Sequence, residues 1–194
     1  MRIIFIRHGR TESNVHRLLD TGFPGAPLDE VGLEQAASLP DRLEGQPIEI
    51  VMTSDITRAR QTGEPVAEAF NVPLITHPGV REIFAGDWEM NPDWEPYVMT
   101  INSWIDDPSD SIPNGDDGHG FFSRFNSALE ELQEYDCAVV VSHGGALLTW
   151  LRTHGDVAID DNPRLHLVNT AIIIVEGKPG AWKVVSWDGL ELVE

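Results

Sequence analysis

Residues 2–9 read Arg2-Ile3-Ile4-Phe5-Ile6-Arg7-His8-Gly9, an apolar run that ends in two basic side chains and a glycine. A short continuous apolar run of this kind predicts a strand buried on both faces, over Arg2–Ile6. Ligands of open α/β sheets bind at the carboxyl ends of the strands, so the turn at Arg7-His8-Gly9 is a candidate site. A histidine at a turn is also common without any function, and this motif alone leaves both interpretations open.

Beyond this run, short β-branched segments alternate with helical patterns. Strands are predicted at Glu49–Thr53 and Ala138–Val141, and helices at Leu33–Leu43, Ile56–Phe70 and Ala146–His154. Such alternation is typical of a layered α/β domain with a largely parallel sheet.

The last two apolar runs predict an antiparallel edge to that sheet. Thr170–Val175 and Trp182–Trp187 are separated by residues 176–181, which carry the glycine and proline of a turn. We therefore expect a single domain over residues 1–194, a three-layer α/β/α sandwich around a six-stranded, mostly parallel mixed sheet. Residues 84–120 are the least regular segment and are expected to form a lid-like excursion over one edge of the sheet.

Composition limits the partners of this chain. It has 13 Lys and Arg against 32 Asp and Glu, a formal charge of −19, which repels nucleic acid and anionic lipid. No apolar run approaches the roughly 20 residues of a membrane-spanning helix, and residues 1–9 lack the pattern of a secretory signal, so a cytoplasmic protein is expected. Cys137 is the one cysteine, which excludes an internal disulfide framework, and it is predicted to be buried.

Two further strand ends carry polar side chains. After the second predicted strand, Ser54 or Asp55 can cap a helix whose first turn contains Arg58, and a guanidinium beside a helix amino terminus suits a phosphate. On its own, this pattern is more often an ordinary cap with surface arginines. The third predicted strand ends in His143 before Gly144, and two strand-end histidines on adjacent parallel strands would face one crevice.

Together these motifs resemble the histidine phosphatase superfamily, the phosphoglycerate-mutase-like proteins. The resemblance covers nearly the whole chain, because separate motifs occur in the family's order. They are Arg7–Asn14, Pro27–Ala36, Ser54–Thr62, Glu82–Glu89 and His143–Gly145.

The resemblance implies roles for individual residues. His8 attacks phosphorus as a neutral imidazole and becomes a phosphohistidine. Arg7, Arg58 and His143 surround the phosphoryl oxygens, with arginine and imidazolium supplying the positive charge, so no metal and no other cofactor is expected. The implied phosphate-binding set is Arg7, Asn14, Arg58, His143 and Gly144, with Asn14 as an amide donor.

Glu82 is implied to protonate the leaving alkoxide and then to activate water. The alternative is a surface carboxylate that pairs with Arg81. Asp87 and Glu89 are weaker candidates for the same proton transfer.

The other histidines are assigned no role. Whether His16 and His119 contact substrate stays open, and His77, His154 and His166 are expected at surface or capping positions.

The predicted lid favours hydrolysis over transfer between substrate positions. No Lys or Arg lies between Ile83 and Ser123, whereas a mutase must hold a carboxylate and a bisphosphate cofactor. Burying a second anion against unpaired carboxylates is costly, so we expect a phosphatase for a small-molecule monophosphate with a neutral, hydroxylated or ring-containing alcohol. Outside this segment, Arg10, Arg17 and Arg60 remain available.

The rival functions are a phosphoglycerate mutase that depends on 2,3-bisphosphoglycerate and a catalytically silent module that binds phospholigands. The chain also departs from the family pattern, with Met90 where glycine is common and with residues 115–117 where Gly-Glu-Ser is common. Homodimerisation is left open, because strand edges in this fold can be covered or paired.

Overall fold

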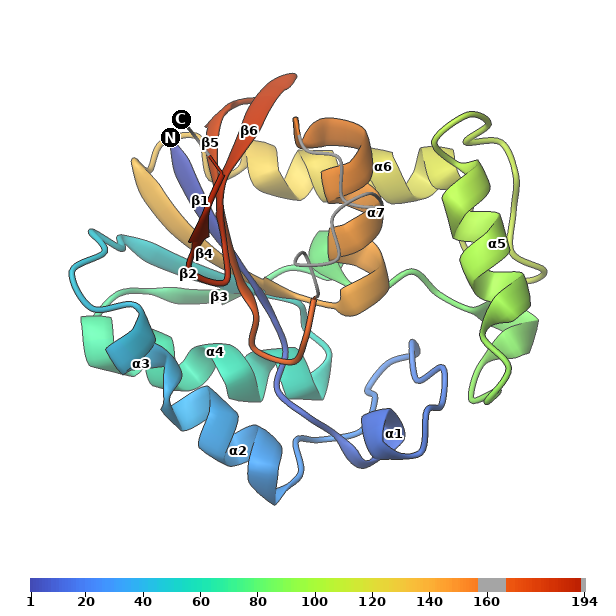
Figure 1. The fold of residues 1–194 in the computed structure, drawn as a ribbon, viewed down its shortest axis with the longest axis horizontal. Coiled ribbons are helices and arrows are strands. Elements are labelled where there is room, and N and C mark those ends of the chain that lie inside the picture. The colour runs from blue at the N-terminus through green and yellow to red at the C-terminus, as the bar shows by residue number, and fades with distance from the viewer. Residues whose placement is uncertain (157–166, 193–194) are drawn as a thin grey trace.

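The computed structural model describes residues 1–156 and 167–192. At its centre is a sheet of seven described strands in the order β3-β2-β4-β1-β5-β6-β7 (Figure 1). The strands are β1 (Arg2–Arg7), β2 (Ile50–Thr53), β3 (Leu74–Thr76), β4 (Cys137–Ser142), β5 (Ile172–Lys178), β6 (Ala181–Trp187) and β7 (Leu190–Glu191). The block β3-β2-β4-β1 pairs in parallel, and the remaining pairs are antiparallel.

The predicted mixed sheet and its terminal hairpin are confirmed, with β5 and β6 forming the hairpin. The described sheet has seven strands where six were expected. The difference comes from short elements, because β3 has three residues and β7 has two, too few to give an apolar run in the sequence.

Helices cover both faces of the sheet, as the three-layer prediction requires. The helices are α1 (Glu12–Val15), α2 (Glu30–Ala37), α3 (Leu39–Arg42), α4 (Thr57–Phe70), α5 (Glu95–Ser103), α6 (Gly118–Glu130) and α7 (Gly144–His154), with 3-10 turns η1 (Pro78–Val80) and η2 (Gly86–Trp88). In Figure 1, α2, α3 and α4 lie on one face and α6 and α7 on the other.

The predicted helix over residues 33–43 is wrong as a single element. The chain forms α2 and α3 with Ser38 between them, and Pro40 lies in the first turn of α3. Proline has no N–H and disrupts a helix interior, but it is tolerated in the first turn, so a new helix begins there.

Alternation along the central strands divides the core in two. Ile3 and Phe5 of β1 join the cluster under α6 and α7, whereas Ile4 and Ile6 join the cluster under α2, α3 and α4. All four are fully buried. A period of two on a strand with both faces covered produces this continuous apolar run, and it fixes the sheet between its two helical layers.

Residues 84–120, whose lid role remains a prediction, contain η2 and α5. Three side chains from α5 and the residue after it, Tyr97, Ile101 and Trp104, are buried in the main core cluster. Met90 has a positive φ of 60°, which explains why glycine is favoured at this position. Across the described residues, no helix is both long enough and apolar enough to cross a membrane.

Candidate active site

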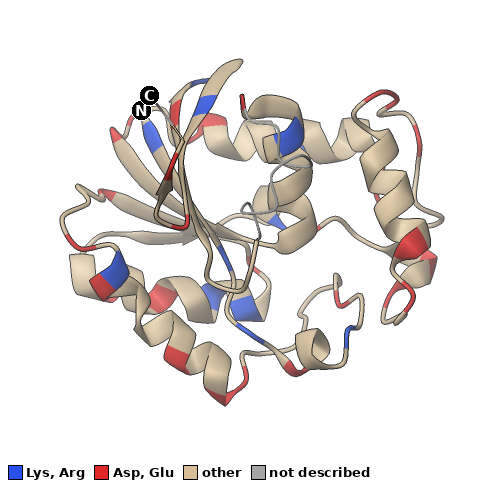
Figure 2. Cartoon of the chain, in the orientation of Figure 1, with Lys and Arg blue, Asp and Glu red and all other residues tan. Residues whose placement is uncertain are grey.

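Sheet register brings the two strand-end histidines together. β1 and β4 are parallel neighbours with Arg7 opposite Ser142, so the next residue on each strand, His8 and His143, leaves the sheet at the same edge. Their ring centroids are 5.1 Å apart. The antiparallel β5 lies on the other side of β1, which places the pair where strand direction changes. In Figure 2, the blue segments that mark Lys and Arg are few, and some of them lie at the end of β1 and in the first turn of α4.

His8 is held in one tautomer. Its Nδ1 lies 2.7 Å from the carbonyl oxygen of Gly9, so Nδ1 carries the proton and donates it there. The lone pair is therefore on Nε2, which accepts a hydrogen bond from Nε of Arg58 at 3.1 Å. Burial, with Arg58 and Arg7 nearby, lowers the pKa of His8 well below its ordinary 6.5. The imidazole is neutral and its Nε2 is nucleophilic.

Gly9 is required for packing. A Cβ on Gly9 would lie 2.7 Å from the carbonyl oxygen of Gly32, and a Cβ on Gly32 would lie 2.1 Å from that of Arg10. The amide of Gly9 donates to Thr62 Oγ1 of α4 at 2.9 Å. The glycine pair therefore lets the loop after β1 sit directly between α2 and α4.

Arg58 extends from the first turn of α4 into the same space, with 3% of its side chain exposed. The predicted cap is wrong, because the N-cap residue is Ile56 without a side-chain cap bond. Ser54 instead accepts from the amide of Ile56, and Asp55 pairs with Arg81. Asp20, which the sequence analysis did not identify, holds Arg58 in place. The carbonyl oxygen of Asp20 accepts from Nη2 of Arg58 at 2.7 Å, and the Asp20 carboxylate lies 3.5 Å from Nη1.

Several polar atoms around the histidines lack partners. Among the described residues, Nε of Arg7, Nη1 of Arg58 and both ring nitrogens of His143 are buried and make no hydrogen bond, although Nη1 of Arg58 lies 3.5 Å from the carboxylate of Asp20. Arg7 is fixed through Nη1, which donates to the carbonyl oxygen of Leu167 at 2.7 Å. Buried polar groups in native proteins are nearly always satisfied, so this cluster is suited to binding an oxyanion.

His143 differs from the expectation of an imidazolium. Burial, Arg58 and His8 lower its pKa well below 6.5, so the ring is neutral. The positive charge beside His8 therefore comes from Arg7 and Arg58, and His143 can supply a neutral N–H donor.

Glu82 occupies the amino terminus of α7. Its carboxylate accepts from the amides of Ala146 at 2.6 Å and Gly145 at 3.0 Å, and from its neighbour Ile83 at 2.9 Å. A Cβ on Gly145 would lie 2.9 Å from Oε1 of Glu82, so glycine is needed for this approach. A carboxylate at a helix amino terminus is favoured by the helix dipole. The alternative pairing with Arg81 does not occur, since Arg81 binds Asp55.

Asn14 lines the same space from α1. Its Oδ1 accepts from the amide of Thr11 and from Nδ2 of Asn169, each at 3.2 Å. Nδ2 of Asn169 also donates to the carbonyl oxygen of His8 at 3.0 Å. With its acceptor occupied, Asn14 has its NH₂ group left to donate. Asn169, which no motif singled out, ties the loop before β5 to His8.

Glu89 and Asp87, the weaker candidates for the proton transfer, lie outside the cavity that contains His8. Glu89 accepts from the amides of Thr21 and Gly22 at 2.8 and 2.9 Å, so it ties the loop after α1 to η2. Asp87 is exposed and accepts from Asn114.

No other histidine in the described ranges lines the cavity that contains His8. His16 pairs with Glu12 at the surface and His119 is exposed. His77 caps η1, His154 stacks on Trp150, and His166 lies outside the described residues.

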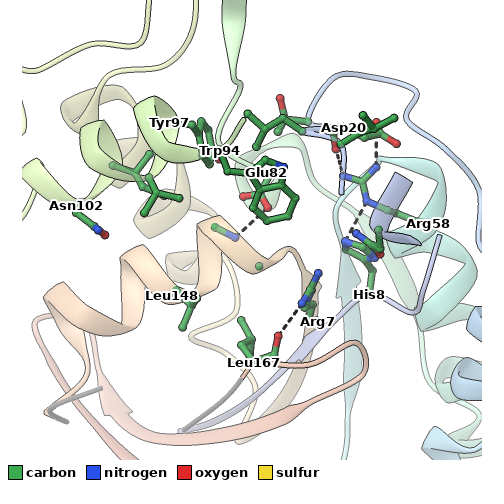
Figure 3. A pocket seen from close by; sticks show the side chains of 18 of the residues that line it. Arg7, His8, Asp20, Arg58, Glu82, Trp94, Tyr97, Asn102, Leu148 and Leu167 are labelled. Atoms are coloured by element: carbon green, nitrogen blue, oxygen red, sulfur yellow. Dashed lines mark hydrogen bonds and ion pairs between the residues drawn. The ribbon is translucent and has the colours of Figure 1, made fainter. Parts of the chain in front are cut away.

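A cavity of about 230 Å³ is lined by Arg7, His8, Asn14, Arg58 and Glu82, whereas His143 lies beside His8 and is not in the lining (Figure 3). We call one part of it the inner end, with Arg7, His8, Asn14, Asp20, Arg58, Glu82 and Gly144. The outer end is lined by Leu18, Trp94, Val98, Ile101, Asn102, Leu148 and Arg152. The outer end is thus mainly apolar, and four of its seven residues come from α5 and its N-cap Trp94.

A cation also lines the outer end, which the sequence interpretation missed. Arg152 of α7 donates to Oδ1 of Asn102 at 2.9 Å. The segment around α5 contains no Lys or Arg, but the opposite wall of the cavity is formed by α7, which contributes Arg152. The arginines that were considered available are elsewhere: Arg10 pairs with Asp29, and Arg60 pairs with Glu64. Over residues 1–156 and 167–192, no cluster of His, Cys, Asp and Glu is suited to a metal ion.

Comparisons with known proteins agree with this geometry. A model of the histidine phosphatase superfamily (branch 1) matches residues 3–189. The adenosylcobalamin/alpha-ribazole phosphatase of Escherichia coli (strain K12) is 35% identical over 154 residues, which cover 76% of this chain and 75% of that protein. A probable phosphoglycerate mutase GpmB of Proteus mirabilis is 31% identical over 199 residues, 96% of this chain and 90% of that protein.

A solved structure of a phosphatase has the same fold. The crystal structure of the alpha-ribazole phosphatase from Shigella flexneri superposes with a TM-score of 0.75 at 28% identity, covering 100% of both chains. The likeness therefore spans the sheet, both helical layers and the segment around α5.

Proposed function

We propose that this chain, which belongs to the histidine phosphatase superfamily (branch 1), hydrolyses small-molecule phosphomonoesters through a phosphohistidine on His8. One observation carries this proposal: four buried polar atoms of Arg7, Arg58 and His143 make no hydrogen bond to the described residues, and they lie around Nε2 of His8, the nitrogen that would attack phosphorus. A phosphoryl group supplies the acceptor oxygens that these atoms need.

In the first step, Nε2 of His8 forms a bond to phosphorus while the ester P–O bond breaks. Nε of Arg58, which donates to Nε2 of His8 in the structure, transfers its hydrogen bond to a phosphoryl oxygen. Arg7, Arg58 and the N–H of His143 stabilise the charge on the equatorial oxygens. Asn14 donates from its amide, and Gly144, whose position lies beside Arg7, leaves room for the phosphoryl group.

We assign two roles to Glu82. In its protonated form it donates a proton to the departing alkoxide, and in the resulting carboxylate form it is the base for the second step. Its carboxylate lines the cavity, fixed on the amides of Gly145 and Ala146. Once the alcohol has left, water takes its place, Glu82 accepts a proton from it, and the new oxygen attacks phosphorus. The P–N bond then breaks, which releases phosphate and regenerates His8.

The outer end favours a monoester whose alcohol is neutral and contains a ring. Trp94, Val98 and Ile101 offer apolar surface, and Asn102, held by Arg152, offers an amide group to a hydroxyl. The Escherichia coli relative is named for alpha-ribazole, which makes alpha-ribazole phosphate the first substrate to test. Because another relative is named as a probable phosphoglycerate mutase, mutase activity is the alternative to test.

Two further proposals concern the partners and the location of the chain. The formal charge of −19 disfavours nucleic acid as a partner. We also propose a cytoplasmic location. Whether two copies pair is a separate matter, which sedimentation of the purified chain measures.

The test is a phosphate-release assay across monophosphates, ranked by kcat/KM, with rapid-quench trapping of the enzyme. We expect turnover and an acid-labile phosphoenzyme, both lost in His8→Ala. The matched control is His119→Ala, an exposed histidine outside the cavity, which keeps both. Tight ester binding without turnover would indicate the silent module. Isomerisation of phosphoglycerate stimulated by 2,3-bisphosphoglycerate would indicate the mutase.

A further inference from the structure

Asp20 is a second carboxylate at the inner end of the cavity, beside the implied acid Glu82. It lies in the loop between α1 and α2, outside every motif that the sequence singled out, and 10% of its side chain is exposed. A carboxylate in a pocket for an anion opposes binding, so its presence there needs a reason.

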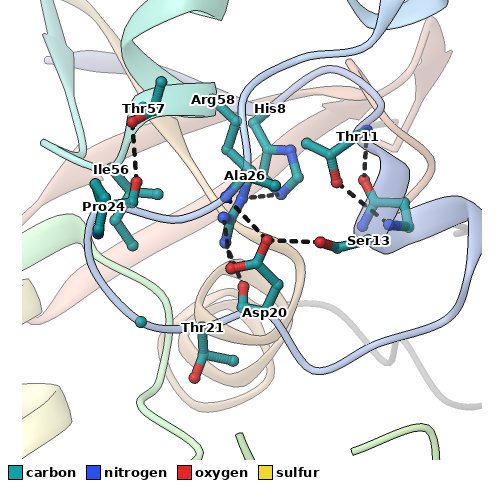
Figure 4. A network of polar contacts seen from close by, with 12 residues as sticks. His8, Thr11, Ser13, Asp20, Thr21, Pro24, Ala26, Ile56, Thr57 and Arg58 are labelled. Atoms are coloured by element: carbon teal, nitrogen blue, oxygen red, sulfur yellow. Dashed lines mark hydrogen bonds and ion pairs between the residues drawn. The ribbon is translucent and has the colours of Figure 1, made fainter. Parts of the chain in front are cut away.

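Contacts of Asp20 connect three parts of the chain (Figure 4). Its Oδ2 accepts from Oγ of Ser13 at 2.7 Å and from the amide of Ala26 at 3.0 Å. Its carbonyl oxygen accepts from Nη2 of Arg58, and its Oδ1 lies 3.5 Å from Nη1. Asp20 is therefore fixed by its own loop and in turn fixes both terminal nitrogens of Arg58.

Arg58 passes that constraint on to the nucleophile. While Asp20 holds its terminal nitrogens, Nε of Arg58 points at Nε2 of His8, 3.1 Å away. Side-chain and backbone contacts thus form one series from Ser13 through Asp20 and Arg58 to His8. A guanidinium held at two points loses little freedom when phosphate arrives, so its direction toward the phosphoryl group is set beforehand.

Charge gives Asp20 a second effect. At the inner end, the basic side chains are Arg7 and Arg58 and the acidic side chains are Asp20 and Glu82, while His8 and the adjacent His143 are neutral. When Glu82 carries the proton that the proposed first step needs, Asp20 is the negative side chain that remains there. The negative charge of Asp20 lies close to the guanidinium that would bind phosphate, so it weakens the hold of the pocket on a dianion.

We propose that Asp20 is a positioning residue that aligns Arg58 for attack by His8 and lowers the affinity of the pocket for the phosphate product. The proposal rests on the proposed function, because Arg58 must bind the phosphoryl group. Alignment speeds formation of the phosphohistidine, and the carboxylate speeds release of phosphate.

Three variants separate these effects. Asp20→Asn removes the charge and disturbs the contact to Arg58, whereas Ser13→Ala removes one support of Asp20 and leaves its charge. Asp29→Asn is the matched control: Asp29 is a similarly buried carboxylate, 7% exposed, that pairs with Arg10 outside the cavity. Asparagine is also a good helix cap, so the start of α2 is kept.

Each variant is measured for its rate of phosphoenzyme formation by rapid quench, its Kd for inorganic phosphate by titration calorimetry, and its pH profile. For Asp20→Asn we expect about tenfold slower phosphorylation and about tenfold tighter phosphate binding. Ser13→Ala should slow phosphorylation several-fold and leave the phosphate Kd unchanged. Asp29→Asn should change neither.

An unchanged phosphate Kd in Asp20→Asn overturns the proposal, and so does loss of one limb of the pH profile, which would make Asp20 a proton donor. Should Asp20→Asn fail to fold, an unchanged phosphorylation rate in Ser13→Ala would still overturn it. Phosphate titration needs no turnover, so a chain that binds phosphate but hydrolyses nothing defeats the proposed function and still tests Asp20.

Discussion

At the inner end of the cavity, His8 and Arg58 are 3% and 2% exposed, whereas Trp94 and Val98 at the outer end are 38% and 37% exposed. His8 follows a strand whose register the sheet fixes, and Arg58 lies in the first turn of a helix. Most of the outer groups that contact solvent come from one short helix, α5, and its N-cap residue Trp94. Reaction chemistry and substrate choice thus rest on parts of the molecule with different constraints, and changes at each should affect different kinetic constants.

The largest effect that sharpens this contrast is expected for Glu82→Gln. If Glu82 protonates the leaving group, the variant should lose about a thousandfold in kcat/KM for an alkyl monophosphate. The loss in kcat/KM should be far smaller for p-nitrophenyl phosphate, whose leaving group needs no proton. The measurement is kcat/KM for both esters, because this constant covers only the steps up to the phosphoenzyme and not the activation of water. The melting temperature is the control, because a glutamine NH₂ would face backbone N–H donors of α7. Equal losses for the two esters would assign Glu82 a purely structural role.

A second effect concerns stability and also belongs to the inner end. In the folded chain the pKa values of His8 and His143 are lowered well below 6.5, mainly by burial. Below pH 6.5 the unfolded chain therefore binds protons that the folded chain does not. Stability should fall as the pH drops from 6.5 toward the folded pKa values, by about 1.4 kcal/mol per pH unit for each histidine.

Urea unfolding of wild type and His143→Gln over a pH series tests this. The variant should show a shallower fall below pH 6.5, and His119→Gln, which changes an exposed histidine, should follow the wild type. Parallel curves for wild type and His143→Gln would contradict the assignment. No described histidine lines the outer end, so variants there should leave the pH dependence unchanged.

How far the sequence predicts each end follows from how each is built. His8 and His143 directly follow apolar runs, so the strand pattern alone places them at one edge. The helix pattern after the second strand made Arg58 a candidate, and the resemblance added Glu82. Asp20 and Asn169 act through loops whose path depends on tertiary contacts, and no periodicity marks them. Arg152 was missed for another reason: it is three turns of helix from the strand end, and only packing of α7 beside α5 brings it to the cavity.

The smallest effect is expected at the outer end, for Trp94→Ala. Removing the indole should raise KM for a monophosphate with a ring-containing alcohol by about tenfold, because apolar contact with the alcohol is lost. The value of kcat should change little, and glycerol phosphate, which has little apolar surface, should be nearly unaffected. Met99→Ala is the matched control, since Met99 lies on the same helix, is 66% exposed and does not line the cavity. A uniform loss of kcat for every ester in Trp94→Ala would show instead that α5 helps to position Glu82, through the hydrogen bond of Tyr97 to Ile83. The two ends would then act together, and the separation of chemistry from substrate choice would be wrong.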